Sequence, residues 1–472
     1  MSNRRRLLFS VVVSFVLSTG APIGASGGAP ELPPTARAAI SRAIEADHGD
    51  PPFEEAKLAS GEENDAFGNS IAISGDTIVV GAPFARPAAV YVFVKPASGW
   101  ADTPVFDAKL TASDGVPSDG FGQSVAVSGD TVFVGASQLN SGSKGAAYVY
   151  VEPASGWAST SAFDAKLTAF DGSTGDGFGA TLAVSGDTIV VGAFNAEIAA
   201  GRRGALYVFE MPASGWASTS AYEARLTASG GGVGDAFGSS LAVSGDTVVG
   251  GAPGAEIGRG AAYVFVKPVS GWSSTSSFAA KLTASGGEFG DGYGQSIAIS
   301  EEAAVVGAPF TRVGSNAAQG AVYVFEKPDA GWASTSAFDA KLTAADGAAQ
   351  DFFGLPVALS GRTVAAGAPA EIGLDRPGSV YVFVRPVDGW QSTSAFDAKL
   401  TASDAAGSDF FGFAVAMSSR ELAASALGPN VTRGAAYVFG GLPPACEPGL
   451  RCATPVSEPP AAPVGPRGRA PS

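Results

Sequence analysis

The sequence contains very few of the side chains on which most catalytic and metal sites depend. Its 472 residues include one histidine, His48, and two cysteines, Cys446 and Cys452. A Ser-His-Asp triad would therefore have to use His48. A structural zinc site cannot be assembled from these three ligands at the spacing that such sites need. We expect no catalytic residues, no bound metal and no other cofactor.

Charged residues are also scarce, and most of them are acidic. They make up 15% of the chain, against roughly 25% in an average soluble protein. The 29 basic and 44 acidic side chains give a formal net charge of −15, and the only basic run is Arg4–Arg6. An acidic chain of this kind repels a phosphate backbone, so we exclude nucleic acid as a partner.

Both ends of the sequence differ in composition from its centre. Arg4–Arg6 precede the apolar run Leu7–Leu17 and then small residues, which is the pattern of a signal peptide over residues 1–25, with cleavage after Ala21 or Ala25. That run is shorter than the roughly 20 residues of a membrane span, and no later run is longer. We therefore predict no membrane span and a protein that is secreted, periplasmic or held at the cell surface.

Residues 26–50 are predicted to be a linker, with a short helix over Thr35–Asp47 for which Thr35 is the N-cap. Residues 441–472 read as a proline-rich tail. In the oxidising compartment to which a signal peptide leads, Cys446 and Cys452 are predicted to close a small disulfide loop.

Glycine, in contrast, is abundant, and its distribution reveals a repeat. The chain has 64 glycines, and their share of its residues is about twice the usual value of about 7%. A Phe-Gly or Tyr-Gly pair recurs at intervals of 54 to 60 residues, and a Gly-Ala step follows it by fourteen residues in six of seven units. A Tyr-Val-Phe-like segment and an Ala-Lys/Arg-Leu segment complete each unit. The aromatic residues of the pair are Phe67, Phe121, Phe178, Phe237, Tyr293, Phe353 and Phe411.

Each unit is predicted to contain four short strands. In the second unit these are Ser124–Ser128, Thr131–Val134, Tyr148–Tyr150 and Phe163–Leu167, because apolar residues alternate there with small or polar ones. Sheets this small bury both faces only by stacking on one another around an axis. The repeats therefore predict an all-β fold over residues 51–440, a seven-bladed β-propeller of four-stranded blades.

The order of the segments predicts how the ring closes. An Ala-Lys-Leu segment at Ala56–Leu58 precedes the first Phe-Gly pair, whereas the seventh unit stops after Tyr437-Val438-Phe439. The N-terminal strand is thus expected to complete the last blade, which also removes an exposed sheet edge.

The motif resembles the FG-GAP repeat of the integrin α-chain propeller and of many exported bacterial proteins. Phe67-Gly68, Gly81-Ala82-Pro83 and Tyr91-Val92-Phe93 show the pattern in the first unit. The resemblance implies an adhesion-type propeller that binds a protein or a surface.

The calcium site of this family is not carried over, so calcium is not expected as a cofactor. Its Asp-rich loop between the first two strands is reduced here to Ser-Gly-Asp-Thr, as at Ser74–Thr77. A loop this short cannot supply the six to eight oxygen ligands that calcium requires.

An aspartate stands two residues before every Phe/Tyr-Gly pair. Some units add a second acid upstream, namely Asp114, Asp171, Asp346 and Asp404. One interpretation is a weak cation site formed by Asp114 and Asp119 or their equivalents. The favoured interpretation is an Asx turn, in which the carboxylate caps backbone N–H groups. The recurring aspartates are Asp65, Asp119, Asp176, Asp235, Asp291, Asp351 and Asp409.

The six tryptophans also share one position, directly after a glycine and eight residues before the Ala of Ala-Lys/Arg-Leu. His48 stands at the same distance before Ala56, and we interpret it as an ordinary surface residue. The tryptophans are either packing residues, which we favour, or platforms on which sugar rings stack. They are Trp100, Trp157, Trp216, Trp272, Trp332 and Trp390.

Together these observations favour a non-enzymatic, monomeric, exported propeller that binds an extracellular protein or a cell-surface glycan. The alternatives are a carbohydrate-binding propeller that uses the tryptophans and, more weakly supported, an extracellular lyase or hydrolase. A protein-binding face should have varied loops between second and third strands, as at Gln138–Lys144, Asn195–Arg203 and Thr311–Gln319. A lectin should instead expose its aromatic residues at equivalent places.

Overall fold

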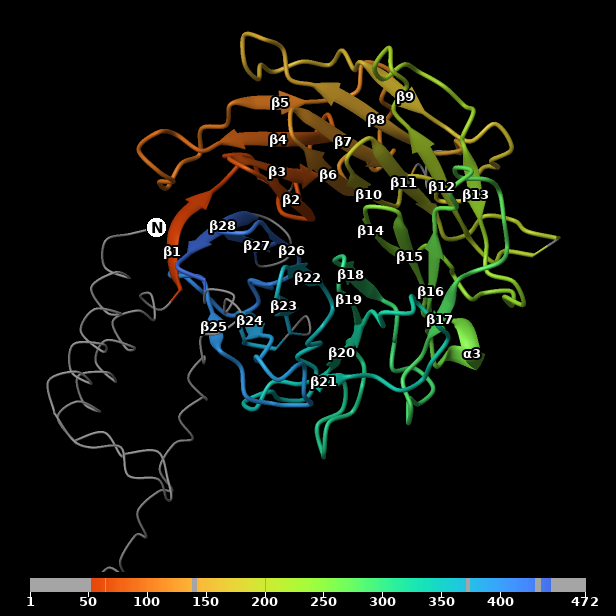
Figure 1. Cartoon of the computed structure of the whole chain (residues 1–472). Helices are drawn as coiled ribbons and strands as arrows, with labels where there is room; N and C mark the ends of the chain where they lie inside the picture. The colour runs from red at the N-terminus through yellow and green to blue at the C-terminus, as the bar shows by residue number, and fades with distance from the viewer. Residues whose placement is uncertain are drawn as a thin grey trace, which may run out of the picture. The chain divides into compact units, whose positions relative to one another are not determined.

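The computed structural model describes residues 52–442 apart from 64, 138–141, 200, 371–373 and 429–433. These residues form 28 strands in seven antiparallel sheets of four strands each. Figure 1 shows the sheets arranged radially around an axis, which confirms the predicted seven-bladed propeller. The predicted signal peptide, linker and helix, together with His48, Cys446 and Cys452, lie outside the described residues.

Within the first six blades the strands run from the axis outward in chain order. The first strands are β2 (Ser70–Ser74), β6 (Ser124–Ser128), β10 (Thr181–Ser185), β14 (Ser240–Ser244), β18 (Ser296–Ile299), β22 (Val357–Ser360) and β26 (Val415–Met417). The second strands are β3 (Thr77–Ala82), β7 (Thr131–Ala136), β11 (Thr188–Ala193), β15 (Thr247–Ala252), β19 (Ala303–Ala308), β23 (Thr363–Ala368) and β27 (Leu422–Ala426).

The third and fourth strands complete each blade. The third strands are β4 (Ala89–Val94), β8 (Ala146–Val151), β12 (Ala205–Glu210), β16 (Ala261–Val266), β20 (Ala321–Glu326), β24 (Ser379–Val384) and β28 (Ala435–Gly440). The fourth strands are β5 (Ala108–Leu110), β9 (Ala165–Leu167), β13 (Ala224–Leu226), β17 (Ala280–Leu282), β21 (Ala340–Leu342), β25 (Ala398–Leu400) and β1 (Phe53–Leu58). One short turn, α3 (Ala255–Gly258), lies between β15 and β16.

Blade 7 is built from both ends of the propeller. Its strand order is β1-β28-β27-β26, and β1 pairs antiparallel with β28 from Phe53↔Gly440 to Leu58↔Ala436. The ring is closed because β26 of this blade contacts β2 of blade 1, as each first strand contacts the next. The N-terminal strand therefore completes the last blade, as the order of the sequence segments predicts.

The blades approach each other most closely at the Gly-Ala steps. A Cβ atom added to Gly135 would lie 2.1 Å from the carbonyl oxygen of Gly179, in the Phe-Gly pair of the next blade. The equivalent glycines Gly81, Gly192, Gly251, Gly307 and Gly367 meet the corresponding oxygen at 2.1 to 2.4 Å. Only a residue without a side chain permits this contact, which explains the glycine content. In blade 7 the position is occupied by the fully buried Ser425.

The core lies between the blades. Each apolar cluster joins residues from two neighbouring sheets, as Val79 and Val92 of blade 1 join Val132 and Tyr148 of blade 2. Aromatic rings meet edge to face within it, with the centres of Phe121 and Tyr148 5.4 Å apart. Because each blade buries both faces, the second and third strands contain few polar residues.

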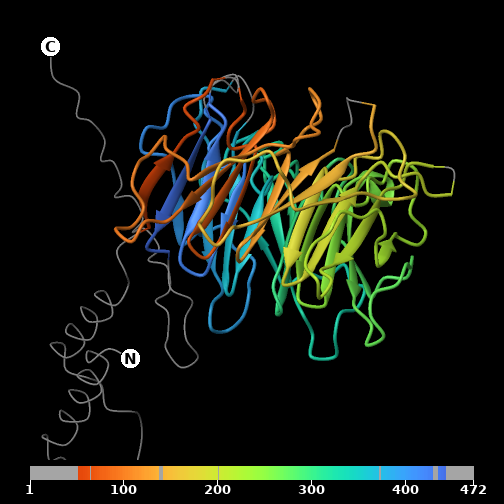
Figure 2. The same ribbon diagram turned by 90° about the horizontal axis from the view of Figure 1, so that it is seen from above.

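The propeller has two faces, which Figure 2 shows edge-on. We call one of them the loop face: it consists of the loops between second and third strands and the connections from each fourth strand to the next blade. The turn face, opposite it, consists of the short hairpins between first and second strands and the connections between third and fourth strands. The alternation of antiparallel strands places these two kinds of segment at opposite ends of every blade.

Candidate functional site

On the loop face, the loops of blades 3, 4 and 5 are each bonded to the connection that leads into the next blade. The amide of Gly234 donates to the carbonyl of Arg202 at 2.8 Å, and that of Gly290 donates to Gly258 at 2.9 Å. Gln350 donates in the same way to Ala317 at 2.9 Å. Side chains on this face therefore sit on a rigid frame.

The recurring aspartates cap backbone amides on this face. The two carboxylate oxygens of Asp119 accept hydrogen bonds from the amides of Phe121 at 3.0 Å and Val116 at 3.1 Å. Asp176, Asp235, Asp291, Asp351 and Asp409 each accept a bond of 2.6 to 2.9 Å from the amide three residues earlier. These bonds support the Asx-turn interpretation of the motif. Burial raises the pKa of Asp176 and Asp351.

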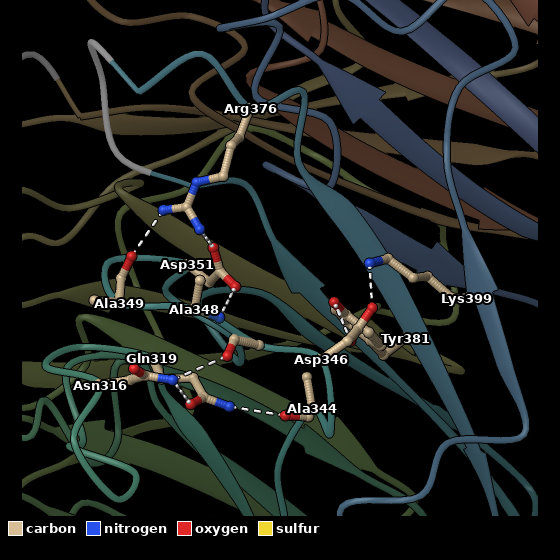
Figure 3. Close-up of polar contacts among 11 residues, drawn as sticks. Asn316, Gln319, Ala344, Asp346, Ala348, Ala349, Asp351, Arg376, Tyr381 and Lys399 are labelled. Atoms are coloured by element: carbon tan, nitrogen blue, oxygen red, sulfur yellow. Dashed lines mark hydrogen bonds and ion pairs between the residues drawn. The ribbon is translucent and has the colours of Figure 1, made fainter. Parts of the chain in front are cut away.

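The second acid, in the five units that have one at this position, has a different partner, the lysine or arginine of the fourth strand. Asp114 accepts hydrogen bonds from Lys166 Nζ at 2.6 Å and from the hydroxyl of Tyr148 at 3.0 Å. Figure 3 shows the equivalent group in blade 6, where Asp346 lies between Lys399 and Tyr381 at 2.6 and 3.0 Å. The corresponding ion pairs elsewhere are Lys109–Glu62, Arg225–Asp171 and Lys57–Asp404.

The two acids of one unit have separate partners, which favours the Asx-turn interpretation over a joint cation site. Asp114 is neutralised by an ammonium group of the protein, whereas Asp119 is bonded to backbone amides. Among the described residues no three His, Cys, Asp or Glu side chains are grouped so that they could hold a metal ion. The sequence contains a signal for the Asp–Lys pair, because the acid and the cation each recur at a fixed place in the unit.

The electrostatics of these acids follow from their partners. Burial of Asp114 opposes its ionisation, but the hydrogen bonds from Lys166 and Tyr148 outweigh that effect, so its pKa lies below the usual value. The pKa of Asp346 and that of Asp404 are lowered in the same way, by Lys399 with Tyr381 and by Lys57 with Tyr437. All three acids are ionised at neutral pH and hold their tyrosine hydroxyls in place.

The tryptophans pack between blades on the turn side. The ring of Trp216 in blade 3 meets Phe133 of blade 2 edge to face at 5.5 Å. Trp100 Nε1 donates to Glu421 of blade 7 at 3.1 Å, and Trp390 is only 7% exposed. All six contact the apolar clusters, Trp157, Trp272 and Trp332 among them. This placement favours packing over sugar stacking.

A feature that the sequence analysis missed is a group of exposed apolar side chains on the loop face of blades 4 and 5. We call Ile257, Phe289 and Phe310 the apolar patch; they are 91%, 80% and 43% exposed. Phe289 lies against Gly258, where an added Cβ would be 2.7 Å from its ring. Phe310 meets the ring of Phe352 at 5.6 Å. Large apolar residues among glycines and aspartates in turns were the signal for this patch.

The predicted variable loops border the patch only in part. Thr311–Gln319 follows Phe310 directly and is held to blade 6 by side-chain amides, as Figure 3 shows. Asn316 Nδ2 donates to the carbonyl of Gly347 at 3.0 Å, and Gln319 Nε2 donates to that of Ala344 at 2.8 Å. Residues 138–141 and 200 of the other two loops lie outside the described residues.

A cavity of about 530 Å³ lies at the seam between blades 7 and 1. Lys57, Asp404 and Tyr437 in its wall are bonded to one another, with the Tyr437 hydroxyl 2.8 Å from Asp404. The ion pair and the hydrogen bond to Asp404 thereby join the closing strand β1 to the ring.

Seven radial four-stranded sheets, closed by a shared blade, define the class of this protein as a seven-bladed β-propeller. The chain belongs to the FG-GAP repeat family, whose model matches it at residues 53–93, 105–150, 162–209, 221–265, 277–325, 337–383 and 395–439. No curated protein matches the sequence. In the part of the chain that the structure describes, no helix has the length and apolar character of a membrane span.

Proposed function

We propose that this propeller is a non-enzymatic, exported protein-binding module whose partner docks on the loop face at the apolar patch. The observation that supports it most directly is the exposure of Ile257 and Phe289, at 91% and 80%, on neighbouring segments of blades 4 and 5. Removing apolar area from water is worth about 25 cal/mol per Å², so covering such side chains favours association. Grouped exposed apolar residues are typical of protein interaction sites.

The frame beneath the patch supports rapid and specific docking. Backbone hydrogen bonds such as Gly290 N to Gly258 O fix the two segments that display Phe289 and Ile257. A surface that is ordered before binding loses little conformational entropy when a partner arrives. An adhesion-type role depends on such an ordered binding surface and not on catalytic groups.

The other two candidate functions have less support. The acids of the repeat are engaged by lysines, arginines and backbone amides, which leaves them poorly suited to a lyase or a hydrolase. The tryptophans contact the inter-blade apolar clusters, with Trp390 buried and the other five half-buried, which supports packing more than sugar stacking. We therefore place the partner among proteins rather than glycans.

The test is selection of binders from a phage-displayed library of random 12-residue peptides, with the full chain as bait. We expect the selected peptides to lose at least tenfold in affinity for an Ile257→Ser/Phe289→Ser variant. The matched control is Val269→Ser, which removes a fully exposed apolar side chain from the turn face and should leave binding unchanged.

A glycan array, run with calcium and again with chelator, provides the opposing outcome. Glycan binding that survives in the patch variant and disappears in Trp→Ala variants would overturn the proposal in favour of a lectin. Selected peptides that bind the patch variant as tightly as the unmodified protein would overturn it as well.

A further inference from the structure

The fourth-strand cation has a carboxylate partner in six of the seven blades. In five of them the partner is the second acid of the same repeat, on the connection that enters the blade. These five pairs are Lys109–Glu62, Lys166–Asp114, Arg225–Asp171, Lys399–Asp346 and Lys57–Asp404, and in blade 4 the pair is Lys281–Glu256. The propeller thus contains the same cation–acid unit many times, which makes any deviation informative.

Blade 5 is the exception. Its cation is Lys341, and no carboxylate oxygen of the described residues lies within 4.0 Å of it. The turn that carries Asp114 in blade 2 is closed by Gly115 N to Ala112 O at 3.1 Å, and its counterpart is closed by Gly287 N to Ala284 O at 3.0 Å. Gly286 therefore stands where blade 2 has Asp114, and a Cβ added to it would meet nothing within 4 Å.

The rest of the unit is intact in blade 5. Lys341 is paired across the strands with Tyr323, as Lys166 is paired with Tyr148. Its ammonium group lies over the Tyr323 ring at 5.5 Å, against 5.0 Å in blade 2. Ala284 packs on the cluster that contains Tyr323, as Ala112 packs on that of Tyr148. The lysine is thus placed as in the other blades, whereas Gly286 lacks the carboxylate and has a positive φ of 78° that none of the five acids has.

Blade 4 shows how the protein compensates when the acid is lost. Gly230 replaces the acid there too, but Glu256 from the loop between β15 and β16 reaches Lys281 instead. The corresponding loop of blade 5, residues 309–320, contains no acidic residue and has Arg312 as its charged side chain. No segment of that loop can therefore supply the anion.

We propose that blade 5 carries a carboxylate-binding notch formed by Lys341 and Tyr323 beside Gly286, and that an Asp or Glu side chain of a protein partner fills it. This inference rests on the proposed function and adds the chemistry of the partner. Phe289 follows Gly286 by three residues, and Phe310 lies in the loop of the same blade. The notch and the apolar patch thus share the connection that enters blade 5, and together they fit a segment in which an acidic residue stands next to large apolar ones.

A protein carboxylate suits the notch better than a free anion. Lys341 is half-buried, and its ammonium lies beside an aromatic ring. A carboxylate with a single negative charge would there take the place of the Asp side chain of the other blades. A single ion pair at such a site binds weakly by itself, and the neighbouring apolar contacts supply the remaining affinity.

The experiment uses the peptides selected on the full chain and measures their affinity for single variants. We expect Asp or Glu next to apolar residues in those peptides and a loss of about tenfold for Lys341→Met, which is about 1.4 kcal/mol. Lys399→Met is the matched control, because that lysine is already bonded to Asp346 and should leave affinity unchanged.

A second variant fills the notch from within. Gly286→Asp restores an acid at this position and should lower the affinity of the acidic peptides by a similar factor. The only loss of thermal stability we expect is the one caused by its positive φ of 78°. Gly230→Asp, at a φ of 76° in blade 4, is its control, since Lys281 already has Glu256 there.

The outcomes separate the two proposals. Peptides that require Phe289 but bind Lys341→Met and Gly286→Asp at full affinity would overturn the carboxylate notch and leave the protein-binding function standing. Peptides that are insensitive to Phe289→Ser would overturn the proposed function itself. Selected peptides without acidic enrichment also count against the notch.

Discussion

At the residue scale, the tightest constraint on this sequence is the contact between a Gly-Ala glycine and the backbone of the next blade. The side chain of any other residue at Gly135 would overlap the Gly179 carbonyl, because an added Cβ lies only 2.1 Å from its oxygen. Ser425 in blade 7 faces the Phe-Gly pair of blade 1 through its own Cβ, 2.9 Å from a Cβ built on Gly68, so the seam is packed differently.

We expect Gly135→Ala to destabilise the propeller by about 3 kcal/mol, the upper part of the range for overpacked sites. The measurement is the free energy of unfolding in guanidinium chloride. Gly129→Ala is the comparison, because its added Cβ meets nothing within 4 Å and its φ of 57° should cost only about 1 kcal/mol. Equal losses in the two variants would show that the inter-blade contact yields easily.

Acid stability at the seam also depends on single residues. Burial of Asp404 opposes its ionisation, but bonds from Lys57 and Tyr437 outweigh that effect and lower its pKa. A carboxylate with a lowered pKa stabilises the fold above the unfolded-state pKa of about 3.9 and loses that contribution as the pH falls through the folded-state pKa. Asp176, Asp351 and Asp397 act in the opposite direction, because burial raises their pKa.

We therefore expect Asp404→Asn to lower the free energy of unfolding at pH 7 by less than about 1 kcal/mol, because the pair is half-exposed, and to have a smaller effect at pH 3. Denaturant titrations at both pH values measure the difference. In a Lys57→Met background the cost of the same substitution should depend less on pH, because only the bond from Tyr437 still lowers the pKa of Asp404. A loss for Asp404→Asn that persists undiminished at pH 3 in the unmodified background would contradict the assignment.

At the scale of elements, β1 has the greatest leverage. It buries Ala56 and Leu58, supplies Lys57 to the seam and covers the edge of β28. We expect deletion of residues 51–61 to destabilise the propeller by more than about 5 kcal/mol, since loss of one buried leucine alone costs about 2–5 kcal/mol. Thermal unfolding checks this result. A chain without residues 26–50 is the control, and a truncated protein that melts like it would refute the closing role of β1.

The repeat made most of these elements predictable. The same pattern occurs in seven units, so each feature could be checked against the others. This applies to the strand alternation around Ser124–Ser128, the Asx turn at Asp119 and the offset of Ala56–Leu58. The partner of Asp114 was not foreseen, because Lys166 lies 52 residues later and the two meet only when the blade folds back on its own entering connection.

The apolar patch was missed for a related reason. Ile257, Phe289 and Phe310 come from three different segments, and large apolar residues recur at the positions of Phe289 and Phe310 in only a few units, as at Val233 and Phe84. A comparison of the units by the residues that they share overlooks the residues that differ between blades. The features that distinguish one blade from its neighbours, such as Gly286 opposite Lys341, became visible only when equivalent contacts were compared in space.

At the scale of the whole molecule, six of the seven blades pair the cation of the fourth strand with a carboxylate of the protein. Each of the five second acids faces a lysine or arginine of its own blade, so a cation from solution has no carboxylate group left to bridge there. We expect chelator to shift the melting temperature of the full chain by less than about 2 °C. Calorimetry with and without EDTA measures this shift. A larger decrease that added calcium reverses would show that calcium stabilises the ring.

The pairing of Phe53 with Gly440 has a mechanical consequence. The chain enters β1 and leaves β28 at the same end of one hydrogen-bonded ladder. A pull applied through the flanking segments would load the bonds of that ladder one after another, as when a zipper opens, rather than all together in shear. Under tension the propeller should therefore yield first in blade 7, at low force, while the six blades formed from continuous chain remain folded.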